Sequence, residues 1–225
     1  MTEVLQRTAM NRRDFSRQLA IASVAASGAF GLIPAAQAQV EITEGREFTR
    51  LKDPVAVAAD GKVEVLEFFG YWCPHCAAFE PTLEAWVRKL PADVSFRRIP
   101  VAFSAAQESF QRLYFGIEAI GAINALHGKV FTAIHANRQH LDKDAELVAL
   151  AASNGVDGAK LLGAMKSFSV ATKLSQARQA AQNYRVDGVP TLAINGRFVT
   201  SVGQAGTHER TVQVMDALIQ RARKL

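Results

Sequence analysis

The stretch VEVLEFFGYWCPHC, residues 63–76, decides the fold of this chain. Its first half, Val63 to Phe69, is apolar except at Glu64 and Glu67, which is typical of a central strand in a sheet covered on both faces. Beyond the second cysteine, apolar residues recur at helical spacing and predict a helix over about 77–90. A strand, a tight connection and a helix therefore surround the CPHC tetrapeptide.

Cys73 and Cys76 are the two cysteines of the chain, and both lie in this tetrapeptide. A disulfide stabilises a protein most when it closes a long loop, whereas a bond between these two residues would close a very short ring. We therefore interpret the pair as redox-active rather than as a structural bridge. A Cys-x-x-Cys sequence beside a β-α unit is typical of thioredoxin-like redox motifs.

Around this unit the character of the sequence changes twice. Residues 39–60 are expected to form an irregular arm, and Val94 to Phe103 a second strand. Residues 104–168 then contain helical patterns and no convincing strand. The last part predicts a long helix at 169–184, a hairpin of Thr191 to Ile194 with Phe198 to Val202, and a terminal helix, Thr207 to Arg223. This order of elements indicates an α/β domain that carries an all-helical insertion.

The N-terminus has the three regions of an export signal in the usual order. A basic region at 12–17 is followed by an apolar region, Leu19 to Ile33, which is too short to span a bilayer. Ala36-Gln37-Ala38 supplies a cleavage site, so the mature chain is expected to begin at Gln39. Export to an oxidising compartment would allow a reversible disulfide to form.

The route of export stays open. Arg12-Arg13-Asp14-Phe15 resembles a twin-arginine motif, but a serine follows the phenylalanine where an apolar residue is usual. Translation from either Met1 or Met10 is compatible with the signal.

Composition limits the functional classes. Apolar residues make up 49% of the chain, which is enough for a sizeable core and argues against global disorder. The net charge of +5 falls to +3 without residues 1–38, and the sequence has no dense patch of Lys and Arg. Nucleic-acid binding is therefore not expected.

The residues now quoted resemble one known family. Leu66 to Phe69 running into Cys73-Pro74-His75-Cys76, with Phe79-Glu80 beyond, is similar to DsbA, the exported thiol:disulfide oxidoreductases. The likeness continues at Gly188-Val189-Pro190 and at Asn195-Gly196. It implies a thioredoxin-like fold. With the export signal at 1–38, we expect the first part of the thioredoxin-like domain at 39–103, the inserted helical domain at 104–168 and the second part of the thioredoxin-like domain at 169–225.

Cys73 is the candidate nucleophile, and we expect its sulfur to be exposed at the start of the helix. A thiolate there is stabilised by unpaired amide N–H groups and by the helix dipole. Pro74 suits the first turn because its missing N–H costs nothing there, and a protonated His75 would lower the pKa of Cys73 further. A more stable thiolate makes the disulfide a stronger oxidant.

Cys76 is the candidate second sulfur, buried one helical turn further on, which resolves mixed disulfides and re-forms the internal bond. Ala77 follows it where a c-type haem site needs histidine. A zinc site needs about four ligands, and His75 alone is nearby, with the histidines between 127 and 140 distant in sequence. We therefore expect no metal and no dissociable cofactor, the Cys73–Cys76 disulfide being the redox group.

Acidic residues near the motif suggest proton chemistry. Glu67 interrupts the apolar strand, and burial there would raise the pKa of its carboxyl; a partly solvated position at the strand end is the alternative. The resemblance places Glu67 beneath Cys76, where it would accept or relay a proton. Glu80 resembles a second family acid, which we expect to act through surface electrostatics. Arg98 aligns where the family often has lysine, and an arginine cannot release a proton in a relay.

The resemblance also implies a substrate site. Pro190 stands at the start of a strand, an unusual place for proline, and the family has a cis-proline there, packed against the sulfurs; from the sequence alone a trans bond is expected. Val189 would then offer backbone hydrogen bonds to an extended client. Trp72 and Tyr71 are expected to line a groove for unfolded clients, whereas Phe79 either joins them or packs in the core.

Together these features predict a periplasmic dithiol oxidase that forms a mixed disulfide with its client through Cys73. The clients would be unfolded or folding exported proteins with free cysteines, and the resemblance implies reoxidation by a membrane quinone-linked partner of the DsbB kind. We expect a monomer.

An isomerase or reductase of the same fold is one alternative. Exported isomerases usually carry an N-terminal dimerisation domain, and only about 25 residues separate the cleavage site from the first strand. A non-catalytic periplasmic chaperone or metal-binding module is the alternative from another class.

Overall fold

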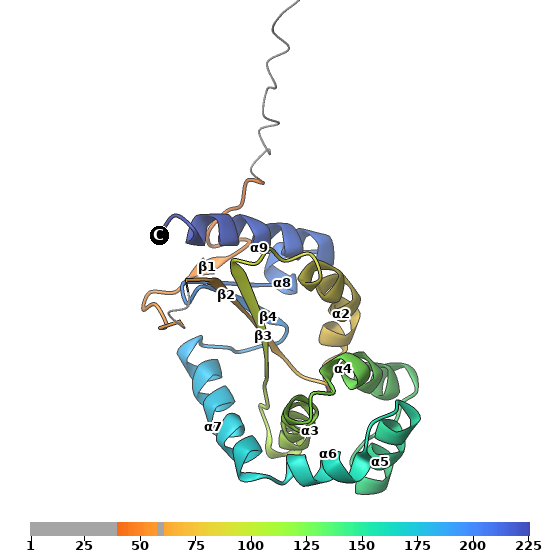
Figure 1. Cartoon of the computed structure of the whole chain (residues 1–225). Helices are drawn as coiled ribbons and strands as arrows, with labels where there is room; N and C mark the ends of the chain where they lie inside the picture. Colours follow the sequence, from red (N-terminus) through yellow and green to blue (C-terminus); the bar gives the residue numbers. More distant parts are fainter. Residues whose placement is uncertain (1–39, 58–60) are drawn as a thin grey trace, which may run out of the picture. The chain divides into compact units, whose positions relative to one another are not determined.

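The computed structural model describes residues 40–57 and 61–225, so the expected export signal at 1–38 lies outside the described residues. Figure 1 shows the elements along the chain. In order they are β1 (Thr49–Arg50), β2 (Val63–Phe69), α2 (Pro74–Val87), β3 (Val94–Pro100), the short 3-10 turn η1 (Ala105–Gln107), α3 (Glu108–Ala119), α4 (Ile123–Phe131), the π-helical turn η2 (Thr132–Ala136), α5 (Asp144–Ser153), α6 (Gly158–Met165), α7 (Phe168–Asn183), β4 (Thr191–Ile194), β5 (Phe198–Ser201), α8 (Val202–Ala205) and α9 (His208–Ala222).

One mixed sheet, with strand order β1-β5-β4-β2-β3, forms the centre of the described chain. The strand that precedes the cysteines, β2, lies inside it, parallel to β3 and antiparallel to β4. All seven residues of β2 are buried, which explains their near-continuous apolar character. The register sets Glu67 directly opposite Arg98 of β3. A carboxylate and a guanidinium thus meet inside the sheet.

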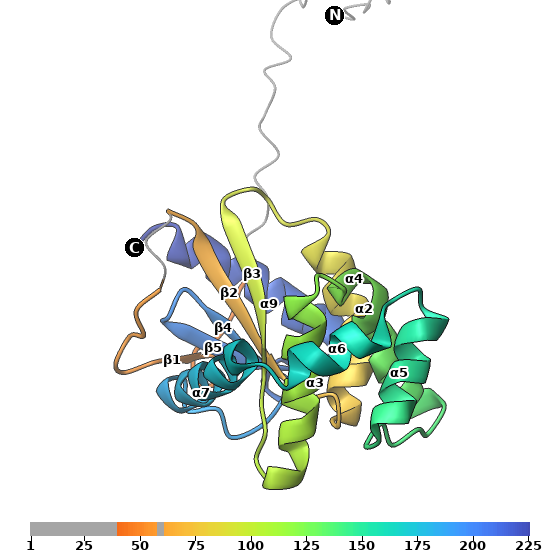
Figure 2. The ribbon, with the colours of Figure 1, turned by 60° about the horizontal axis from the view of Figure 1, so that its bottom comes forward.

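Helices cover both faces of this sheet (Figure 2). On one face α2 and α9 pack against the strands, through a core that includes Phe79, Leu83, Val214 and Leu218. On the other face Leu66 and Phe68 of β2 begin a second core that continues through α3 and α7 into the helices of the insertion. Helix α2 thus packs against the sheet on one side and meets α4 of the insertion through Glu80 and His127 on another.

The expected α/β fold with a helical insertion is confirmed, while the limits of several elements differ from those expected. Helix α2 begins inside the motif at Pro74 and ends at Val87. Strand β3 ends at Pro100, and the Val101 N–H still bonds to the Phe69 carbonyl as the chain leaves the sheet. The expected arm contains the short edge strand β1, which pairs with β5. No helix in the described ranges is long and apolar enough to cross a bilayer.

Candidate redox site

Cys73 is the N-cap residue of α2, with an extended backbone (φ −90°, ψ 117°), and Pro74 occupies the first helical position. The Cys73 Sγ accepts a hydrogen bond from the Cys76 N–H, at 3.4 Å. As a protonated thiol it also donates to the carbonyl oxygen of Val189, at 3.3 Å. Both cysteines are free thiols in this structure. The first turn of α2 therefore directs the Cys76 N–H, which has no partner within the helix, at the first sulfur, and such a donor stabilises a thiolate.

The two sulfurs have opposite acidities. The pKa of Cys73 falls to about 6, chiefly through the side-chain hydrogen bond with Cys76, with smaller contributions from the backbone N–H groups of Cys76 and His75 and from the His75 charge. Burial raises the pKa of the Cys76 thiol far above its ordinary value, because a thiolate is poorly solvated there. At neutral pH the reduced pair therefore holds one thiolate, on Cys73, and one thiol.

The expectation that Cys73 is exposed is wrong, since only 3% of the residue is accessible. Val189, in the loop before β4, covers it, and the Cys73 thiol bonds to the carbonyl of that residue. The peptide bond between Val189 and Pro190 is cis, as the resemblance implied. His75, in contrast, is exposed beside the covered sulfur.

A buried cluster of charged side chains lies behind the second cysteine. Arg98 of β3 donates from Nε to Glu67 Oε2 at 3.0 Å, and from Nη2 to Glu80 Oε1 at 2.9 Å and Glu84 Oε1 at 2.6 Å. Burial raises the pKa of Glu67 to about 8 and that of Glu80 to about 7, against the opposing charge of Arg98. The negative charge of Glu67 also contributes to the raised pKa of Cys76. The cluster can therefore hold protons near neutral pH, next to the second sulfur.

Two sequence interpretations of these acids are now decided. Glu67 is 1% exposed, so it is the buried carboxyl and not a solvated glutamate at a strand end. Glu80 is 6% exposed, so the expectation of a surface electrostatic role is wrong. Its side chain turns inward because the guanidinium of Arg98 and the helix α4 lie on that side of α2.

The aromatic residues of the motif divide between core and surface. Tyr71 is 1% exposed and cannot form the edge of a substrate groove, which corrects the sequence expectation. Phe79 is fully buried in the core between α2 and α9. Trp72 is half-buried, and its Nε1–H donates to the Val101 carbonyl at 3.3 Å. Phe103, which is 49% exposed, packs edge-on against this ring at 5.8 Å. Trp72 and Phe103 thus present an apolar surface near the cysteines.

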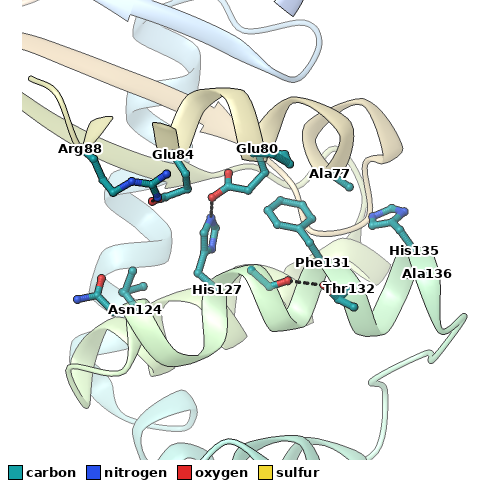
Figure 3. Close-up of a pocket in the computed structure, with 13 residues that line it drawn as sticks. Ala77, Glu80, Glu84, Arg88, Asn124, His127, Phe131, Thr132, His135 and Ala136 are labelled. Atoms are coloured by element: carbon teal, nitrogen blue, oxygen red, sulfur yellow. Dashed lines mark hydrogen bonds and ion pairs between the residues drawn. The ribbon is translucent and has the colours of Figure 1, made fainter. Parts of the chain in front are cut away.

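The inserted helices contribute side chains that the sequence did not predict to be near the cysteines. A cavity of about 790 Å³ separates α2 from α4 and η2, and Figure 3 shows its lining, which includes Glu80, Glu84, His127, Phe131 and His135. The last three residues follow one another at four-residue spacing, which places them on one face of a helix. This spacing in the sequence indicates that the three side chains share a helix face, but it does not reveal against which element that face packs.

The described residues do not supply the set of ligands that a metal ion needs. Within residues 40–57 and 61–225, no group of three or more His, Cys, Asp or Glu side chains is arranged to hold a metal ion.

Comparison with known proteins agrees with this geometry. Residues 64–210 match the model of the DSBA-like thioredoxin domain. Two curated relatives, both called thiol:disulfide interchange protein DsbA, come from Bordetella parapertussis (41% identical, covering 96% of this chain and 100% of the relative) and from Pseudomonas aeruginosa (39% identical, 90% and 94%). The crystal structure of Pseudomonas aeruginosa DsbA superposes with a TM-score of 0.78 at 39% identity, covering 81% of this chain and 95% of that one. The chain therefore belongs to the DsbA family of thiol:disulfide oxidoreductases.

Proposed function

We propose that this protein is a periplasmic dithiol oxidase that donates a Cys73–Cys76 disulfide to exported proteins while they fold. A client thiolate attacks Cys73 Sγ, the S–S bond breaks, and Cys76 leaves with the electron pair and takes up a proton. A second client thiolate then attacks the client sulfur of the mixed disulfide and releases Cys73 as thiolate. The client loses two electrons as its disulfide forms, and the enzyme pair is reduced.

The observation that supports this direction is the low pKa of Cys73, about 6, beside a second sulfur whose pKa lies far above neutral. A thiolate that is stable at neutral pH is a good leaving group, so the mixed disulfide resolves toward oxidised client. The fold stabilises the Cys73 thiolate, and this makes the disulfide more oxidising than it would be with an unshifted cysteine.

Glu67 is the group we propose to supply the proton to Cys76. Its carboxyl is buried, its pKa is raised to about 8, and its charge acts on the Cys76 sulfur. Pro74 and His75 contribute through the first turn of α2, where the backbone N–H of His75 helps to lower the pKa of Cys73.

Clients are proposed to bind as extended segments along the cis-proline loop. Val189 lies directly beside Cys73, with Pro190 next to it, and an extended chain there would form backbone hydrogen bonds with the loop. The half-buried ring of Trp72, with Phe103 against it, offers apolar contact for the client side chains. Such a surface suits unfolded proteins with free cysteines rather than one folded partner.

Localisation and turnover rest on the family and on the sequence. The signal-like segment at 1–38 supports export to the periplasm, by the Sec or the twin-arginine route. A redox-active disulfide is the group that the DsbA family uses, and we propose reoxidation by a membrane quinone-linked partner of the DsbB kind. The protein is proposed to act as a monomer.

The test is oxidation of a reduced, unfolded client by the purified oxidised protein, with both thiols titrated. Cys73→Ser should abolish oxidation, and Cys76→Ala should accumulate a mixed disulfide through Cys73 that mass spectrometry identifies. Adducts through Cys76 alone would reverse the two roles.

The equilibrium of the pair with glutathione separates the alternatives. A strongly reducing value would favour a reductase over an oxidase. A chaperone would bind and release the client with the thiols of both proteins unchanged.

A further inference from the structure

His127 of α4 lies between the active-site loop and the buried carboxyl cluster, although it comes from the inserted helices. It is 3% exposed. Its Nδ1 lies 2.8 Å from the Tyr71 hydroxyl, and its Nε2 lies 3.2 Å from Glu80 Oε1. Figure 3 shows the imidazole pointing from α4 toward Glu80 on α2. The ring is enclosed by four aromatic rings, those of Phe69, Tyr71, Tyr114 and Phe131.

The protonation of this ring is restricted by its surroundings. Burial, and the nearby charge of Arg98, lower the pKa of His127 to about 3. The imidazole is therefore neutral at neutral pH and carries one proton for two polar neighbours. With the proton on Nε2, the ring turns an N–H toward Glu80 and accepts from the Tyr71 hydroxyl. With the proton on Nδ1, it donates to Tyr71, and Nε2 is free to accept from a protonated Glu80.

Several buried atoms around this ring lack partners. Within the described residues, His127 Nε2, Glu80 Oε2 and Glu67 Oε1 make no hydrogen bond. A buried polar atom without a partner is destabilising, and a proton placed between His127 Nε2 and Glu80 Oε1 would give Nε2 a partner. A proton can therefore lie between His127 Nε2 and Glu80 Oε1, which are 3.2 Å apart, and can be carried by either the imidazole or the carboxyl.

The other groups that face His127 differ in what they can exchange. Arg98 stays charged because a guanidinium does not release its proton. Burial raises the pKa values of Tyr71 and Tyr114 well above neutral. Glu84 of α2 acts on His127 through its charge, and His135 lies on the same cavity, bonded to the Tyr71 carbonyl at 2.7 Å. Glu80 therefore has two neighbours in the described chain that can both donate and accept a proton, the carboxyl of Glu84 on its own helix and the imidazole of His127 from the inserted helices.

We propose that His127 is a positioning residue for the redox pair: by bridging Tyr71 to Glu80, it sets the pH at which the buried carboxyl cluster takes up the proton that accompanies reduction of Cys73 and Cys76. This inference rests on the proposed function for its role in turnover. The inserted helices are then more than a cover for the active-site helix, because one of their side chains controls the proton supply.

The experiment measures the equilibrium of the pair with glutathione from pH 5 to pH 9.5, with the two redox forms separated by thiol trapping. His127→Leu replaces the imidazole by an apolar group of similar reach, so the Glu80 carboxylate is less well solvated. We expect the inflection caused by the cluster to move upward by about one pH unit, which is about a tenfold change in proton binding. The inflection of Cys73, followed separately by thiolate absorbance, should move much less.

Three variants make the result specific. His127→Gln keeps a donor and an acceptor at comparable reach and should restore the wild-type inflection. His140→Leu, at an exposed position shortly after η2, is the matched control and should change nothing. In a Glu80→Gln background, His127→Leu should no longer shift the inflection, since the group it acts on is gone.

An unchanged inflection in His127→Leu would overturn the proposal, and so would an equal shift in the Gln variant, which would assign the effect to ring packing. If the Leu variant does not fold, His127→Asn replaces it, since the shorter amide cannot span both partners and should show the same shift. None of these measurements uses a client. Failure of the wild-type protein to oxidise a client would therefore count against the proposed function alone.

Discussion

Acidification should reverse the relative stability of the two redox forms. In the reduced protein the pKa of Cys73 is lowered to about 6, against about 8.5 in an unfolded chain. A lowered folded-state pKa gives stability that is fully present above the unfolded pKa and is lost as the pH falls through the folded one. Cys76 is a thiol in both the folded and the unfolded state at neutral pH, so its raised pKa matters only above about pH 8.5.

The magnitude follows from these two pKa values. The Cys73 thiolate contributes about 1 kcal/mol of stability to the reduced form at pH 7, about 3 kcal/mol at pH 8 and almost nothing at pH 5. Closing the short Cys73–Cys76 ring stabilises the oxidised form by about 2 kcal/mol at every pH, in the chain-entropy model. The oxidised form should therefore be the more stable at pH 5 and the reduced form at pH 8, with the crossing between pH 7 and pH 8. Pro74 and His75, which follow Cys73, are exposed, so screening by solvent makes the free energies given for the thiolate upper limits.

The assay is guanidinium unfolding of both redox forms at pH 5, 7 and 8, with thiol content checked at each point. Cys73→Ser is the matched control, because it forms neither the disulfide nor the Cys73 thiolate, so its stability should lack the loss on acidification that the reduced wild-type protein shows. A difference between the redox forms that stays constant from pH 5 to pH 8 would refute the reasoning. So would an oxidised form that gains relative stability as the pH rises.

Three further substitutions test the site. His75→Ala should raise the pKa of Cys73 by less than about one unit, because the His75 charge is the smallest of the contributions while the backbone N–H remains; thiolate absorbance against pH measures this, and a rise of two units would contradict it. Glu67→Gln should slow client oxidation severalfold without weakening client binding, since the proton next to Cys76 is lost; stopped-flow kinetics would show whether binding weakens instead. Arg98→Met should lower the free energy of unfolding by about 3 kcal/mol, because the buried carboxylates of Glu67 and Glu80 lose their cation. Arg97→Met, at a largely exposed side chain, should lower it by less than about 1 kcal/mol. Equal losses of the two variants in denaturant melts would refute the distinction.

Local chemistry explains why much of the fold could be predicted from the sequence. Strand β2 is buried along its whole length and therefore reads as an apolar run. The hairpin between β4 and β5 turns at Asn195 and Gly196, both of which have positive φ (51° and 63°), as a two-residue hairpin turn requires. Cys73 at the N-cap and Pro74 at the first helical position follow the same local rules. In each case the residues that determine the structure are neighbours in the chain.

The parts that the sequence did not reveal depend on contacts between distant segments. The cover over Cys73 comes from Val189, more than a hundred residues away. The inward turn of Glu80 depends on where α4 docks, and no periodicity within α2 distinguishes a buried acid from an exposed one at that position. The burial of Tyr71 has the same cause, because His127 and His135 of the insertion contact its hydroxyl and its carbonyl.

The acid cluster has a physical logic that joins both proposals. Three carboxyl groups share Arg98, and two of them have pKa values of about 8 and about 7, so at neutral pH the cluster holds at least one proton in a place that solvent hardly reaches. When the disulfide breaks, Cys76 leaves as a buried thiolate, whose charge the surroundings do not stabilise. A proton already stored on Glu67 removes that charge at once, and the proton must then be replaced. An arginine cannot replace it, so the exchange falls to Glu80 and to the two groups beside it, Glu84 and His127. Because His127 belongs to the inserted helices, we expect substitutions there to alter the pH dependence of a reaction whose sulfurs lie elsewhere.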